Sequence, residues 1–415
     1  MSIVQQTGAA GFLARYEALR GSLPGDPAPR ALAAAAFRAA GLPGGTQQRR
    51  SEAWKYTSLR PVAEAAFPGS AGGTGLLADL PALAAPRLVF VDGRFDGAMS
   101  DTVPWFSSFA DQPVFGNQPR PDRDPLVALN TMLADDGAIL RVPAGVDAGV
   151  VQIVSLGTGA AAFHPRHSLH LEPGATLAVL EIAIGEGAYL HNPVTEITVG
   201  TGAHLTHVRL QDECVDAFHL STIYADLAEG ATYDGFSLVL GGRMTRTELH
   251  ARMIGKHAIA HLNGAQLLSG TQHADFTSVV RHDAPHCTSR QTVKNVLNGR
   301  SRGVFQGRIE VARHAQKTDG YQMNQALLLS PDAEIDSKPE LEIFADDVKC
   351  SHGATVGELD ADQLFYLRSR GVPDSEARAL LVRAFLAEAL DLISNDAIRA
   401  ALEQRVELWW KRQAA

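Results

Sequence analysis

The chain has 415 residues, of which 45% are hydrophobic and 20% are charged, so it can bury a substantial core. Its formal net charge of −9 argues against a nucleic-acid or anionic-membrane surface, because both need a basic field. Three dispersed cysteines, Cys214, Cys287 and Cys350, do not resemble a disulfide framework and indicate a reducing compartment. The N-terminus shows no export signal and no apolar run is long enough to span a bilayer, so we expect a cytoplasmic protein without membrane contact.

Residues 1–125 mix helical patterns with Pro- and Gly-rich joints, and we assign them to an N-terminal helical region. Strong helix formers fill Ala31–Ala40, and Gly41 follows them as a stop signal. Leu88–Phe95 reads LVFVDGRF, in which an Asp-Gly step separates two apolar runs. This pattern predicts a small hairpin.

Residues 126–357 are β-like, with short alternating runs such as Thr206–Leu210 punctuated by glycine. A Gly-Ala step begins at Gly174, Gly202 and Gly230, 28 residues apart each time. A period of that length without helical patterns predicts stacked coils, as in a β-helix or solenoid. The end coils then need caps, which the helical ends of the chain are placed to supply; the alternative is an open edge to which a partner adds strands.

Residues 358–415 form the third predicted unit, a C-terminal helical domain. Asp360 begins a capping-box pattern, and Gly371 marks the end of the first helix. Pro373 opens a second helix, and Asp396–Arg412 forms a third. We expect the apolar faces of these helices to pack on each other, the alternative being a face on which a partner docks.

All 15 histidines lie in the predicted β region. His191 and His219 are 28 residues apart, as are His286 and His314, so each pair would sit one coil apart, about 4.8 Å along the stack. We expect both pairs to be stacked rings rather than metal ligands.

The sequence lacks the motifs of several enzyme classes. It has no GxxxxGK[ST], so nucleotide hydrolysis would belong to another chain, and no GxSxG. Asp212 and Glu213 are adjacent and would face opposite ways on a strand, which is poor geometry for a glycosidase or lyase. A β-helix carbohydrate lyase or hydrolase is nevertheless the alternative function, although all four tryptophans lie outside the β region.

Cys350 and His352 are the candidate metal residues. On a strand they point to the same face, about 7 Å apart along the backbone. A thiolate and an imidazole suit Fe, Zn or Cu, but two ligands do not complete a site. The rest would come from elsewhere in the fold, from a partner chain or from sulfide; the alternative is a small buried thiol beside a hydrogen-bonded histidine.

A family resemblance is dense over residues 290–390. It rests on four segments: Gly303–Ile309 (GVFQGRI), Ala315–Asn324 (AQKTDGYQMN), Lys338–Thr355 (KPELEIFADDVKCSHGAT) and Leu364–Gly371 (LFYLRSRG). Gly41–Leu59 adds a segment similar to an N-terminal signature. On these motifs the chain resembles the SufB/SufD family of the SufBCD iron–sulfur cluster assembly complex. The resemblance implies a mainly β fold, a right-handed parallel β-helix flanked by N-terminal and C-terminal helical domains.

The resemblance also implies a scaffold subunit that is not an enzyme. The subunit would pair with SufB through β-helix edges, or with itself when alone, and its C-terminal helices would dock the SufC ATPase. The family's metal-related histidine corresponds to His352, with Cys350 beside it. Iron or a nascent iron–sulfur cluster would bind there transiently, shared with SufB, and no cofactor would be held permanently.

Two departures place the chain nearer to the SufD members of the family. Where SufB reads Glu-His-Glu-Ala-Thr, residues 351–355 read SHGAT. Where SufB has a cysteine in Gln-Cys-Asp-Ser, residues 322–325 read QMNQ, and a thioether cannot carry a persulfide. We therefore expect His352 to supply an imidazole while SufB supplies the nucleophilic thiol.

Overall fold

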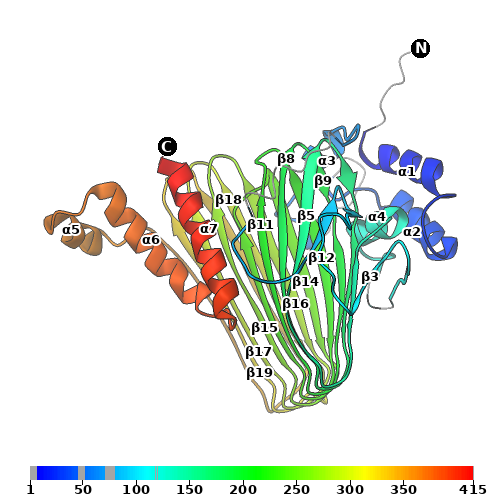
Figure 1. Cartoon of the computed structure of the whole chain (residues 1–415). Helices are drawn as coiled ribbons and strands as arrows, with labels where there is room; N and C mark the ends of the chain where they lie inside the picture. The colour runs from blue at the N-terminus through cyan, green and yellow to red at the C-terminus, as the bar shows by residue number, and fades with distance from the viewer. Residues whose placement is uncertain (1–6, 45–51, 71–79, 117, 119, 415) are drawn as a thin grey trace.

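A parallel β-helix built of two facing sheets occupies the centre of the computed structural model, which describes residues 7–44, 52–70, 80–116, 118 and 120–414 (Figure 1). Residues 45–51, part of the expected N-terminal signature, lie outside the described residues. In order across the first sheet, the strands are β2 (Arg94–Phe95), β1 (Arg87–Val91), β5 (Asp147–Gly159), β8 (Thr176–Gly187), β11 (His204–Glu213), β13 (Thr232–Val239), β15 (Ile259–Leu268), β17 (Thr288–Leu297), β19 (Asp319–Leu328) and β21 (Lys349–Gly357).

The second sheet faces the first across the core. Its strands, in order, are β20 (Glu334–Ile343), β18 (Arg302–Val311), β16 (His273–His282), β14 (Met244–Met253), β12 (Phe218–Leu227), β10 (Val194–Val199), β7 (Arg166–Leu171), β4 (Ala138–Val142) and β3 (Phe106–Ser108). Two short strands, β6 (Ala162–Phe163) and β9 (Leu190–His191), join it beside β12. The predicted parallel β-helix is confirmed.

Glycines at one corner set the period of the coils. Gly174, Gly202 and Gly230 all have positive φ, between 63° and 69°, a conformation that glycine adopts without steric penalty. The strands that follow pair in register, so that His204 lies opposite Thr232, 28 residues further on. The Gly-Ala repeat therefore marks successive coils, as predicted.

The period lengthens in the later coils, and this makes one histidine prediction wrong. Thr288 pairs with Asp319, 31 residues on, so His314 does not lie above His286. His286 instead stacks on His257 of the preceding coil, with ring centroids 5.0 Å apart.

The first coil is closed by strands and helices of the N-terminal region. β1 and β2 form the predicted hairpin, and β1 continues the ladder by pairing with β5 in parallel. The helices are α1 (Gly8–Leu19), α2 (Pro27–Ala40), the 3-10 helix η1 (Glu52–Trp54), α3 (Arg60–Glu64) and α4 (Pro125–Leu133). Phe37 of α2 and Leu129 of α4 pack in one apolar cluster with Leu220 of the second sheet.

The C-terminal helices are α5 (Ala361–Ser369), α6 (Asp374–Leu390) and α7 (Asp396–Ala414), close to the predicted bounds. They do not cap the last coil, which corrects that expectation, whereas the expected packing between helices is present: α6 contacts both α5 and α7. Val382 of α6 and Leu402 of α7 also pack against Val208 and Leu238 on the outer face of the first sheet. α5 has no buried residue and projects away from the β-helix (Figure 1).

Strand alternation divides the interior into an apolar part and a polar part. Leu205 of β11 points into the main apolar cluster, together with Ile223 of the facing sheet. The alternate residues further along β11 are all polar and buried: His207, Arg209, Gln211 and Glu213. The interior beside this end of β11 therefore holds a polar cluster.

No helix in the described part of the chain is both long enough and apolar enough to cross a membrane.

Candidate functional site

Cys350 and His352 lie on β21, the last strand of the first sheet. Cys350 is opposite Gly320 and His352 is opposite Gln322 of β19, and no further strand pairs with β21 among the described residues. The Lys349 N–H donates to the Thr318 carbonyl, so alternate N–H groups, including those of Cys350 and His352, point toward the open edge. The two candidate residues thus share one strand and one free edge.

The surroundings of the two side chains differ. Cys350 is half-buried and packs with Ile309 and Val311 of β18, whereas His352 is exposed. Burial raises the pKa of the Cys350 thiol, so the thiol is protonated at neutral pH. No third His, Cys, Asp or Glu of the described chain completes a group of three with them.

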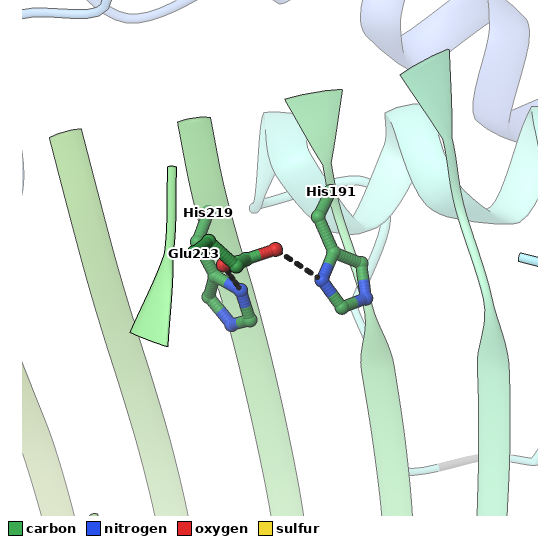
Figure 2. Close-up of side chains that lie close together, drawn as sticks. All are labelled: His191, Glu213 and His219. Carbon is green, nitrogen blue, oxygen red and sulfur yellow. Dashed lines mark hydrogen bonds and ion pairs between the residues drawn. The ribbon is translucent and has the colours of Figure 1, made fainter. Parts of the chain in front are cut away.

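A second cluster lies inside the β-helix, where His191, Glu213 and His219 converge (Figure 2). His191 Nδ1 lies 3.1 Å from Glu213 Oε1, and His219 Nδ1 lies 2.7 Å from Glu213 Oε2. His191 and His219 are register neighbours on β9 and β12, as their spacing predicts. Their rings meet edge to face at 81° instead of stacking.

The carboxylate of Glu213 is held ionised by this arrangement. Burial alone would raise its pKa, but the imidazoles of His219 and His191 more than offset burial and hold the pKa well below its usual range. Gln211 Nε2 donates a further hydrogen bond of 2.9 Å to Oε2. Burial lowers the pKa of His219, whose Nε2 accepts from the Arg209 guanidinium at 3.2 Å.

The neighbouring carboxylate faces the other way, as strand alternation predicts. Asp212 points outward and binds Arg405 and, at 2.9 Å, Arg412 of α7. It therefore anchors a helix, while Glu213 joins the internal polar cluster. Sequence patterns alone do not predict that Glu213 meets His191 and His219, because the three residues lie on different strands. The polar alternation along β11 is the available signal.

Comparison with known proteins identifies the family. Residues 154–385 match the SufBD core domain of SUF system FeS cluster assembly. The chain is also 34% identical over 376 residues to the iron–sulfur cluster assembly protein SufD of Escherichia coli, covering 87% of this chain and 89% of that protein. The chain belongs to the SufB/SufD family.

Other members of the SufB/SufD family agree. A SufBD family protein from Synechocystis is 31% identical and covers 86% of each chain. A SufBD family protein from Mycobacterium bovis is 32% identical over 270 residues, 62% of this chain and 67% of that protein. The chain therefore has a role in iron–sulfur cluster assembly.

Proposed function

We propose that this chain is a non-catalytic scaffold subunit of a SufBCD complex, which pairs with SufB through its open last coil. The proposal rests above all on one observation: the terminal strand β21 carries both Cys350 and His352 and has a free edge. Ile343, Phe344 and Val356 add exposed apolar side chains at the same end. An exposed edge with apolar side chains is a template for strand addition by a partner.

Cys350 and His352 then contribute to a composite iron site at this seam. A thiolate and a neutral imidazole bind iron, but they supply only two ligands, so the partner or sulfide completes the set. Iron, or the growing cluster, is the cargo of this site. The subunit supplies ligands held in a fixed geometry and catalyses no reaction itself.

The C-terminal domain docks the SufC ATPase in this proposal. α6 and α7 are held against the outer sheet face by apolar packing, whereas α5 has no such cover. Phe365 and Tyr366 of α5 are 73% and 57% exposed. Large exposed aromatic side chains on a projecting helix are typical anchors of a protein interface.

Reconstitution with SufB and SufC tests this function. We expect the wild-type chain and the His352→Ala variant to form complexes of equal mass, with the variant complex holding several-fold less iron and sulfide. Ser351→Ala is the matched control, because Ser351 is also exposed on β21 but points to the opposite face. Undiminished iron and sulfide in the His352→Ala complex would contradict the composite site. Self-pairing of the chain in place of SufB binding would contradict the proposed partner.

A further inference from the structure

We infer that His191, Glu213 and His219 form a buried site for one divalent transition-metal ion, of the ferrous iron or zinc class. The site is separate from Cys350 and His352 and needs no partner chain. The inference does not depend on the proposed SufB pairing.

The geometry supplies three converging ligands. One ligand atom from each residue lies within 4.8 Å of the other two, and the Glu213 carboxylate sits between the two imidazoles (Figure 2). All three residues are buried, with at most 4% of their surface exposed. Two imidazoles and one carboxylate suit Zn²⁺ and Fe²⁺, and they leave positions open for water.

The charges around the cluster favour a cation. The buried Glu213 carboxylate forms no ion pair with an arginine or lysine of the described residues; Arg209 lies beside Glu181 instead, with its Nε 3.5 Å from Glu181 Oε2. Because a buried charge needs a compensating partner, one negative charge requires a cation or a proton on a histidine. A divalent ion bound to Glu213 meets this need.

Two polar atoms beside the cluster have no hydrogen-bond partner among the described residues. They are His191 Nε2 and the Tyr189 hydroxyl, and both are buried. A Cβ atom on Gly185 would lie 2.2 Å from that hydroxyl, so the glycine leaves the room that Tyr189 occupies. Buried polar atoms without partners indicate a missing ligand or water.

Metal binding through Nδ1 requires a proton to move from Nδ1 to Nε2 on both histidines, because both Nδ1 atoms now face the Glu213 carboxylate. To bind through Nδ1, neutral His219 must carry its proton on Nε2, the atom that now accepts from Arg209. Two donors would then face each other, so the guanidinium turns toward Glu181, the acceptor already beside it. No charge is created by these changes, because each proton stays on its own ring.

Metal analysis of the full chain tests the site. The chain is stripped with a chelator, equilibrated with Zn²⁺ or, without oxygen, Fe²⁺, and desalted before the bound metal is measured. We expect one tightly held equivalent in the wild type and in the Cys350→Ala/His352→Ala control. His191→Ala and His219→Ala should lose it, and Glu213→Gln should bind at least tenfold more weakly. No retained metal in the wild type, or equal retention in the folded histidine variants, would overturn the site.

Co²⁺ gives a readout on the wild type that does not depend on any variant folding. Nitrogen and oxygen ligands should produce visible d–d bands without a thiolate charge-transfer band in the near ultraviolet. A thiolate band that disappears in Cys350→Ala would place the metal at the chain end and overturn the internal site. Failure of SufB pairing alone would leave the expected Co²⁺ spectrum unchanged, so the two proposals fail separately.

Discussion

Neutral histidines buried inside the β-helix make its folding sensitive to acid. Burial lowers the pKa of His164 to about 3, and the pKa values of His167 and His282 to about 4. The same side chains in an unfolded chain have a pKa of about 6.5. Below about pH 6.5, these histidines therefore bind protons in the unfolded state but not in the native state.

The sign of the pH dependence follows from this difference. Stability is complete above about pH 6.5 and falls as the pH drops toward the folded pKa values, by about 1.4 kcal/mol per pH unit for each fully responsive histidine. We expect urea unfolding at pH 5 to show a lower free energy than at pH 7, and His164→Gln to flatten this slope by about one proton. An identical slope in the variant would contradict the assignment of His164.

At the scale of elements, one carboxylate adds ion pairs to the apolar packing between the last helix and the sheet. The Asp212 side chain is 3% exposed and binds Arg405, which is 10% exposed, and also Arg412. Removing Asp212 leaves a nearly buried guanidinium without this carboxylate partner.

We therefore expect Asp212→Ala to lower the free energy of unfolding by about 3 kcal/mol and to reduce amide protection in α7. Asp216→Ala is the matched control, since Asp216 is exposed in the turn that follows β11, and it should change stability by less than about 0.5 kcal/mol. Equal stability of the two variants would contradict the anchoring role.

The projecting helix α5 makes a separate prediction. Phe365→Ser combined with Tyr366→Ser should weaken SufC binding at least tenfold without changing the unfolding midpoint, because neither side chain is buried. Leu32→Ser is the control, since Leu32 of α2 is 72% exposed at the other end of the molecule. Titration of SufC against each variant measures the difference in affinity for SufC. Unchanged binding by the α5 variant would show that SufC does not dock on α5.

The limits of sequence-based prediction lie in long-range packing. The Gly-Ala spacing predicts the coils because the corner conformation is local. The pairing of His286 with His314 failed because loop residues change the coil length without changing strand patterns. The sequence also does not predict that α6 and α7 cover the outer sheet face, because an apolar helix face has the same residue pattern whichever surface it packs against. Cys350 and His352 were placed correctly on one strand, but the sequence did not predict the internal cluster.

At the scale of the whole molecule, the two ends of the β-helix are unequal. The first coil is closed by the β1–β2 hairpin, by β3 and by the N-terminal helices. At the last coil, β21 is largely exposed and β20 is mostly half-buried, and neither has an outer partner strand among the described residues. Association by strand addition is therefore directed to one end, the end that carries Cys350 and His352.

The most direct test of this account compares the affinity for SufB of two variants substituted at Ala354. By strand alternation the Ala354 N–H points to the open edge, so Ala354→Pro removes an edge donor without breaking the ladder to β19. Ala354→Val keeps that donor and is the control. We expect Ala354→Pro to fold normally and bind SufB at least tenfold more weakly than Ala354→Val. Equal binding by the two variants would show that the open edge of β21 is not where the partner pairs.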